Sequence, residues 1–182
     1  LIVFIPISSA TELSLTYDTN GNLITGDGKY REYNEFNQLI RVRDGNIISG
    51  DILEEYIYHP TDDRIIVKKA NTNEFNPFDE VTLYFSDSFV RHRKNVEGND
   101  HITDTYYVRD DSGIAGEISY NATQIDNNFN LVGKKFYHND HLGSTSIITN
   151  ESGDIVEETF YDPCGEILSG GSESRFDYEG KE

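Results

Sequence analysis

One short unit occurs three times in this chain, and its residue types dictate a tight turn wherever it stands. It consists of a tyrosine, an acid or amide directly after it, a glycine or asparagine four positions after the tyrosine, and an aliphatic residue six positions after it. The three copies are Tyr17, Asp18, Gly21 and Leu23; Tyr33, Asn34, Asn37 and Leu39; and Tyr161, Asp162, Gly165 and Ile167. Asp and Asn side chains bond the backbone two residues ahead, and Gly and Asn tolerate the left-handed conformation. Each unit therefore predicts a hairpin, in which the tyrosine ends one strand and the aliphatic residue begins the next.

Strand-like runs fill the chain between these units. Residues 55–58, 64–69, 81–85, 103–108 and 114–120 are rich in Ile, Val, Tyr and Thr and are bounded by polar turns. Residues 121–130 are rich in Asn and predict a loop or a hairpin end. No run of ten or more residues has the 3.6-residue period of an amphipathic helix. The sequence therefore predicts an all-β fold, in which consecutive antiparallel strand-turn-strand units form a curved sheet.

The stretch from Phe136 to Glu182 repeats the same alternation with a distinctive wording. Its sequence is FYHNDHLGSTSIITNESGDIVEETFYDPCGEILSGGSESRFDYEGKE, in which polar turns at residues 139–143, 150–154 and 162–165 separate strand-like runs. Its most characteristic residues are Tyr137, Asp140, His141, Leu142 and Gly143 in the first part, and Tyr161, Asp162, Pro163 and Gly165 in the second. Asp, Asn, Gly and Pro are the residues that tight turns demand, so the stretch predicts three successive hairpin ends.

In these motifs the chain resembles the Rhs/YD-repeat proteins, whose repeat-associated core has the sequence pattern YHxDHLGSTxxxTxxxGxxVxxxxYDPFGE followed by xRYxGKE. Residues 15–46 resemble the family's run of YD repeats, and residues 64–69 resemble its GRRVKK strand, with Asp63 in place of the leading glycine. The family's DPFG is here Asp-Pro-Cys-Gly, with Cys164 in place of the aromatic residue. The resemblance divides the chain into an apolar N-terminal segment at 1–13, YD repeats at 14–134 and the start of the repeat-associated core at 135–182.

This resemblance implies a structural rather than a catalytic role. Strand-turn-strand units of the family spiral into a β-shell that encloses a C-terminal toxin or belongs to a secreted or cell-surface protein. The expected partners are then the rest of the same shell and an encapsulated toxin. The resemblance makes Tyr17, Tyr33, Tyr137 and Tyr161 stacked aromatics, and places Gly21, Gly143 and Gly165 at turns. No residue here matches the family's self-cleavage segment, so we expect no catalytic residue, no cofactor and no enzyme activity.

Composition supports a second interpretation of a different class. The chain holds 12 Tyr, and aromatic residues make up 12% of it. Exposed aromatic rings stack on sugars and on partner proteins, so the alternative function is a surface adhesion module or a carbohydrate- or protein-binding β module. The net charge of −18 argues against nucleic acid and against an anionic membrane surface. Tyrosines packed on the inside would favour the shell, whereas a contiguous patch of solvent-facing tyrosines would favour the binding module.

Other candidate sites are weaker. His138, Asp140 and His141 lie close enough in sequence to bind a metal, but Asp140 in a turn is better explained as a backbone acceptor, so we expect no metal there. The acids at 99–111 lack the spacing of a calcium loop. The basic cluster at 91–94 is expected to pair with neighbouring acids. Cys164 is the only cysteine, which excludes an internal disulfide. Residues 1–13 predict a strand or the remnant of a signal peptide.

Overall fold

The computed structural model describes residues 14–70, 79–111, 113–123 and 128–173, and every regular element in them is a β-strand. The predicted N-terminal strand or signal-peptide remnant at 1–13 lies outside the described residues. The strands are β1 (Thr16–Tyr17), β2 (Leu23–Thr25), β3 (Lys29–Tyr33), β4 (Leu39–Asp44), β5 (Ile52–Tyr58), β6 (Ile65–Ala70), β7 (Glu80–Ser86), β8 (Phe89–Val96), β9 (Asn99–Asp110), β10 (Gly113–Thr123), β11 (Asn130–Asn139), β12 (Thr145–Asn150), β13 (Ile155–Glu158), β14 (Phe160–Tyr161) and β15 (Ile167–Ser169). No helix among the described residues is long and apolar enough to cross a membrane.

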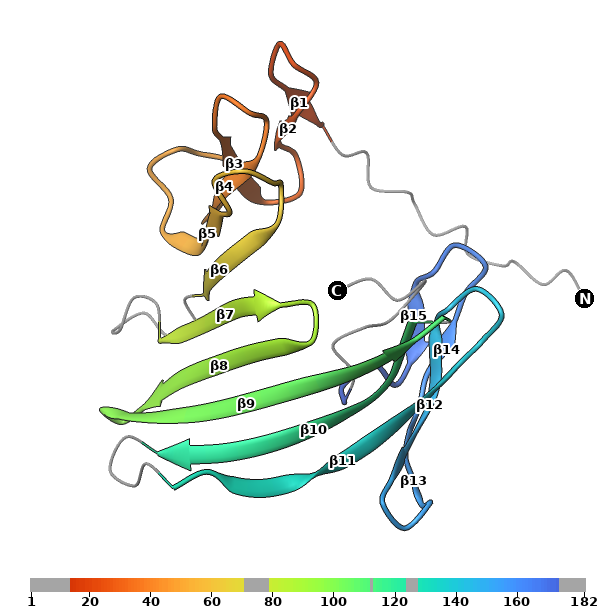
Figure 1. Ribbon diagram of the computed structural model, residues 1–182. Helices are drawn as coiled ribbons and strands as arrows, with labels where there is room; N and C mark the ends of the chain where they lie inside the picture. Colours follow the sequence, from red (N-terminus) through yellow and green to blue (C-terminus); the bar gives the residue numbers. More distant parts are fainter. Residues whose placement is uncertain (1–13, 71–78, 112, 124–127, 174–182) are drawn as a thin grey trace, which may run out of the picture.

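The sheet is a meander in which chain order and spatial order coincide. Eleven strands, β3 to β13, follow one another, and each pairs antiparallel with its neighbours in sequence. Figure 1 shows the resulting curved sheet, with the long strands β9, β10 and β11 bending across the molecule. The predicted all-β fold of consecutive antiparallel units is therefore confirmed. β11 runs across the boundary between residues 134 and 135, so both sides of that boundary belong to one sheet.

The first and last hairpins differ from the single continuous sheet that the sequence predicts. β1 and β2 form a two-stranded sheet of their own, and so do β14 and β15. Between β2 and β3 the chain turns through Gly26 and Gly28, whose φ values are +143° and +79°. A side chain at Gly26 would also collide with Leu15, because its Cβ would lie 2.4 Å from Leu15 Cδ2. These glycines redirect the chain before three-residue β2 can join the main ladder.

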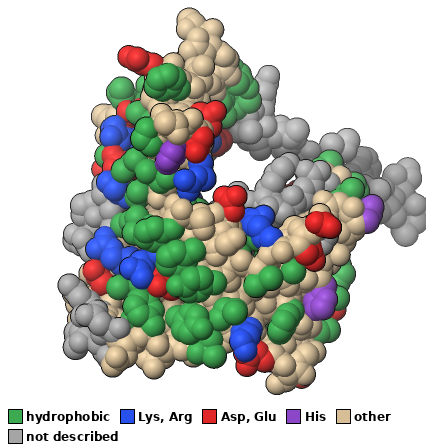
Figure 2. Space-filling model, in the orientation of Figure 1, with side chains coloured by type: hydrophobic (Ala, Val, Ile, Leu, Met, Phe, Trp, Pro, Cys, Tyr) green, Lys and Arg blue, Asp and Glu red, His purple; other side chains and the backbone are tan. Residues whose placement is uncertain are grey.

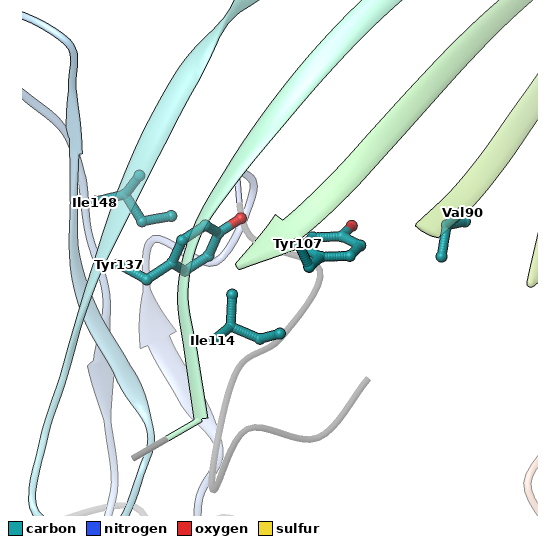
Figure 3. Packing of buried hydrophobic residues seen from close by; sticks show 5 residues of the cluster. All are labelled: Val90, Tyr107, Ile114, Tyr137 and Ile148. Carbon is teal, nitrogen blue, oxygen red and sulfur yellow. The ribbon is translucent and has the colours of Figure 1, made fainter. Parts of the chain in front are cut away.

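A small core lies on one face of the sheet. Val90, Tyr107, Ile114, Tyr137 and Ile148 form one buried cluster, and Ile148 is fully buried. Figure 3 shows the Tyr137 and Tyr107 rings between Ile148 at one end and Val90 at the other. We call the sheet face that carries Tyr107 and Tyr137 the cluster face. The core is small because its residues come from one sheet layer.

The opposite face carries a row of rings, and we call it the aromatic face. Directly paired residues of neighbouring strands share a face, and Phe89 pairs with Tyr106, which pairs with Ile118. Phe85 stacks on Phe89 at 5.0 Å between ring centroids, and Phe89 stacks on Tyr106 at 4.6 Å. Hydrophobic side chains gather over β7 to β10 in the view of Figure 2. Much of this apolar surface is open to solvent, since Phe85 and Tyr106 are 54% and 43% exposed.

The loop or hairpin end predicted at residues 121–130 lies where the paired strands β10 and β11 follow one another, but its predicted bounds are too wide. Residues 121–123 continue β10, and Asn130 begins β11. Asn121 pairs with both Thr103 and Asn130, and its Oδ1 accepts a hydrogen bond of 2.9 Å from Thr103 Oγ1. Cross-strand pairing thus outweighs the low strand propensity of asparagine. Residues 124–127 lie outside the described part.

Candidate functional site

The turn at Asp140 is built around one carboxylate. Asp140 Oδ1 accepts the backbone N–H of Leu142 at 2.8 Å and that of Ser144 at 2.9 Å. The Asp140 N–H donates to the Ser144 carbonyl at 2.8 Å, and the Gly143 N–H donates to the Asp140 carbonyl at 3.1 Å. Gly143 has a φ of +88°, in the region that glycine adopts without strain. Four hydrogen bonds therefore close a turn of five residues, and we call the acid or amide that starts it the turn head.

The same four hydrogen bonds close five turns. Their heads are Asp18, Asn34, Asp140, Asn150 and Asp162. The residue three positions after each head has positive φ; these residues are Gly21, Asn37, Gly143, Gly153 and Gly165. The structure places the predicted units on these turns: Tyr17, Tyr33 and Tyr161 end strands, and Leu23, Leu39 and Ile167 begin the next ones. Asp and Asn serve equally as heads, because only a side-chain oxygen acceptor is needed.

Tyrosines that stand directly before a turn, two of them before a turn head and Tyr58 before His59, bind the preceding hairpin. The hydroxyls of three such tyrosines each donate to a backbone carbonyl: Tyr33 to Leu23 at 3.1 Å, Tyr58 to Leu39 at 2.8 Å and Tyr161 to Thr145 at 2.9 Å. Each of these carbonyls belongs to the residue five positions after an earlier turn head. The phenol therefore joins consecutive hairpins at the same end of the sheet. For Tyr33 and Tyr161 this is a hydrogen-bonding role, which the expected stacking does not describe.

Other side chains extend these links along the same end of the sheet. Asn20 Nδ2 and Asn22 Nδ2 both donate to Asn37 Oδ1, at 2.8 and 3.0 Å, and Gln38 Nε2 donates to Asp63 Oδ1 at 2.8 Å. These bonds connect the first turn to the second and the second to the third. Side-chain donors to backbone carbonyls continue the series: Arg64 to Tyr84, Arg109 to Asp87 and Asn139 to Ile114. We call this series of turns, which lie at residues 17–23, 33–39, 58–65, 86–89, 110–113, 139–145 and 161–167, the turn rim.

The hydrogen-bond donors around the aspartate turn heads lower the pKa values of their carboxyl groups. Burial alone would raise the pKa of Asp140, but the N–H groups of Ser144 and Leu142 hold this pKa below its ordinary value. The side-chain and backbone donors of Asn22 likewise lower the pKa of Asp18. Both carboxylates are therefore charged at neutral pH and act as hydrogen-bond acceptors, which is a structural use of an acid.

Most of the residues that resemble metal ligands have other partners. Asp140 is occupied by the turn backbone, and His138 Nε2 lies 3.0 Å from Thr149 Oγ1. Asp104 binds Arg91, and Asp100 accepts from Asn95 and Arg93. Within the described residues no three His, Cys, Asp or Glu side chains come together as a metal site would require.

The basic cluster at 91–94 pairs with acids on neighbouring strands, as predicted. Arg91 lies 2.6 Å from Asp104, Arg93 lies 3.2 Å from Asp100, and Lys94 pairs with Glu80. These pairs join β7, β8 and β9 across the sheet. The cluster is therefore used in cross-strand ion pairs.

Sequence reasoning placed Tyr58 and Asn139 at predicted turns but missed the hydrogen bonds that they make to the preceding hairpins. Tyr58 precedes His59, whose Nδ1 lies 3.4 Å from the Thr61 N–H and so takes the place of an Asp or Asn oxygen. Asn139 precedes Asp140 and uses its amide where other units use a phenol. The signal for Tyr58 was its position directly before a polar turn with a proline. Cys164 is exposed, and its N–H donates to Asp162 Oδ1 at 2.7 Å, which any non-proline residue at that position could do.

Removing one rim phenol should weaken the sheet measurably. We expect Tyr58→Phe to lower the free energy of unfolding by about 1 kcal/mol, because the half-buried Leu39 carbonyl loses its donor. Tyr17→Phe is the matched control, since Tyr17 is 57% exposed, and it should change stability by less than about 0.5 kcal/mol. Urea unfolding of both variants measures the difference. Equal effects of the two substitutions would contradict the role given to the phenol.

Solved structures share the fold of this sheet. No protein-family model and no curated protein matches the chain by sequence. A crystal structure of TcdB2-TccC3 matches with a TM-score of 0.73 and 16% identity, over 91% of this chain and 8% of that one. A Photorhabdus luminescens Tc holotoxin pore matches with a TM-score of 0.74, 16% identity and the same coverage. The chain has the fold of a part of these toxin subunits. It spans less than a tenth of their length, and at this identity the likeness concerns the fold alone.

Proposed function

We propose that this chain is a non-catalytic wall segment of a larger Rhs/YD-repeat shell, which encloses or displays a C-terminal effector such as a toxin. The observation that carries the proposal is the turn rim: consecutive hairpins, including the two that form small sheets of their own, are bonded to one another by side chains along one end. Such a device extends a sheet without limit, because each hairpin binds the one before it. The structural likeness to Tc toxin subunits and the Rhs/YD-repeat wording of the sequence support it.

In this function the parts of the chain have different tasks. The YD repeats at 14–134 and the beginning of the repeat-associated core at 135–182 both contribute strands to the wall. The partners are the adjoining strands of the same shell at β3 and β13, together with the enclosed effector. The complete protein is secreted or displayed at the cell surface, and the wall performs no chemistry of its own.

The reading frame around this segment provides the test. We expect it to continue on both sides with further tyrosine-Asx turn units, and cryo-electron microscopy of the whole product should reveal a hollow particle with β3–β13 in its wall. A whole product that is a compact domain without a cavity would refute the shell. A variable C-terminal domain inside the particle would identify the enclosed effector.

A further inference from the structure

The first turn contains a pair of residues that can react with each other without an enzyme. Asn20 is followed by Gly21, and this is the only Asn-Gly pair in the sequence. Both residues are exposed, and no atom lies within 4 Å of the position that a Cβ on Gly21 would take. A glycine nitrogen is the least crowded nucleophile that a backbone offers, because no side chain shields it. The pair is therefore a candidate site of deamidation, which converts an asparagine to an aspartate.

Two hydrogen bonds restrain the atoms that would react. Asn20 Nδ2 donates to Asn37 Oδ1 at 2.8 Å, which ties the side chain to the turn between β3 and β4 (Figure 1). The Gly21 N–H, on the nitrogen that would attack, donates to the Asp18 carbonyl at 3.2 Å. For the attack, the Asn20 carboxamide must turn toward the Gly21 nitrogen, and this nitrogen must leave its acceptor. The reaction therefore starts from a local opening in which both bonds are broken.

The side chain of Asn37 can be removed without disturbing its own turn. Asn37 has a φ of +61°, and glycine occupies the corresponding position in the other four turns of this kind. Its N–H donates to the Asn34 carbonyl, a bond that glycine would keep. Asn22 Nδ2 also donates to Asn37 Oδ1, at 3.0 Å, but has a second acceptor in Asp18 Oδ2 at 2.8 Å. The restraint on Asn20 can thus be tested separately from the fold of the second turn.

We propose that Asn20 deamidates spontaneously at a rate set by Asn37, and that this change opens the link between the first two hairpins. Gly21 N attacks Asn20 Cγ and closes a cyclic imide; the Cγ–Nδ2 bond breaks, and ammonia leaves with the proton that Gly21 N gives up. Water then opens the imide at one of its two carbonyls, which yields aspartate or isoaspartate and needs no further reactant. The product has only acceptor oxygens where Asn20 had a donor, so the bond to Asn37 Oδ1 is lost.

Peptide mapping by mass spectrometry in ¹⁸O-labelled water measures the reaction at Asn20. The 182-residue chain is kept in mildly alkaline buffer, either folded or unfolded in urea. We expect the folded chain to react roughly thirtyfold more slowly, since two hydrogen bonds must open first. Asn37→Gly should accelerate the folded chain about fivefold, the factor that one net hydrogen bond contributes. Gln38→Ala is the matched control, because it breaks the next link of the turn rim, to Asp63, without a contact to Asn20, and the rate should not change.

A further substitution tests the attacking nitrogen. Gly21→Asn places a side chain beside this nitrogen and suits the positive φ, as Asn37 shows in the second turn. It should leave Asn20 unmodified over the time in which half of the native chain reacts. Equal rates for the native chain and Asn37→Gly, both folded by circular dichroism, would overturn the proposal, because the link would then not restrain Asn20. A folded chain that stays unmodified at Asn20 while the unfolded chain reacts completely would overturn it as well.

The consequence for the first hairpin has its own measurement. Asn20→Asp reproduces the aspartate product, and Asn130→Asp adds the same charge at an exposed position of β11. The Asp18 N–H donates to the Asn22 carbonyl at 2.9 Å, and the Asn22 N–H donates to Asp18 Oδ1 at 2.8 Å. We expect hydrogen exchange at these two amides to rise about fivefold in Asn20→Asp and not in Asn130→Asp. Unchanged exchange in Asn20→Asp would show that the modification leaves the link closed.

These outcomes leave the wall function untouched. The Tyr33 hydroxyl joins the same two hairpins through its bond to the Leu23 carbonyl, and it does so whether or not Asn20 is modified.

Discussion

Replacing Glu157 with alanine is expected to lower the free energy of unfolding by about 3 kcal/mol, because several donors lose one shared acceptor at once. Glu157 is 8% exposed, and its Oε2 accepts three hydrogen bonds, from Ser172 N and Oγ at 2.8 Å and from Glu173 N at 3.0 Å. Thr159 Oγ1 donates to its other oxygen at 3.2 Å. One buried carboxylate therefore holds the segment after β15 against β13. Its removal leaves backbone donors without an acceptor.

Urea unfolding and hydrogen exchange at Ser172 and Glu173 measure this loss. Glu158→Ala is the matched control, because Glu158 is the exposed neighbour on the same strand, and it should change stability by less than about 0.5 kcal/mol. Unchanged protection of the Ser172 and Glu173 amides in Glu157→Ala would show that the carboxylate does not hold the segment.

The same carboxylate gives stability a defined pH dependence. Burial acts to raise the pKa of Glu157, but the donors from Ser172, Glu173 and Thr159 outweigh it and lower this pKa below 4.5. The folded state thus binds the proton less tightly than the unfolded state. The contribution of Glu157 is complete above pH 4.5 and is lost as the pH falls through the lowered value. Glu157→Gln should flatten the stability curve between about pH 5 and 3 relative to the native chain.

The hairpins were predictable because their chemistry is local. In each unit the turn head, the residue with positive φ and the first residue of the next strand lie within six positions of one another, so sequence spacing alone specifies the turn. The strand ends at Tyr33 and Tyr161 follow from the same spacing. The order of the sheet follows in turn, since short antiparallel turns leave consecutive strands as neighbours.

What was not predictable depends on partners far away in sequence. β8 was missed because residues 91–94 are all basic, so the sequence shows no alternation of apolar and polar residues there. Ion pairs with Glu80, Asp100 and Asp104 on neighbouring strands stabilise these basic residues in the sheet. The bond from Glu157 to Ser172 joins residues 15 positions apart, across a hairpin. The row of rings on the aromatic face likewise gathers Phe89, Tyr106 and Tyr120 from three strands. No local pattern encodes such juxtapositions, which arise only when the sheet has formed.

Asp140→Ala is expected to lower the free energy of unfolding by about 2 kcal/mol, whereas Asp140→Asn should be nearly neutral at pH 7. Alanine removes the acceptor of two backbone N–H groups, one of them on Ser144, which is fully buried. Asparagine keeps an oxygen in the same place, and Asn34 and Asn150 already serve as heads with this geometry. Thermal unfolding should separate the two variants by roughly 6 °C.

The pH dependence of these two variants distinguishes charge from hydrogen bonding. Because the pKa of Asp140 is lowered in the folded state, its charge contributes stability above the unfolded value of about 3.9, and that part disappears as the pH falls. Asp140→Asn should therefore approach or exceed the native stability near pH 3, while Asp140→Ala stays below it. If asparagine is as damaging as alanine at neutral pH, the head acts through its charge. Asp and Asn heads would then share the hydrogen-bond geometry of the turn without contributing equally to stability.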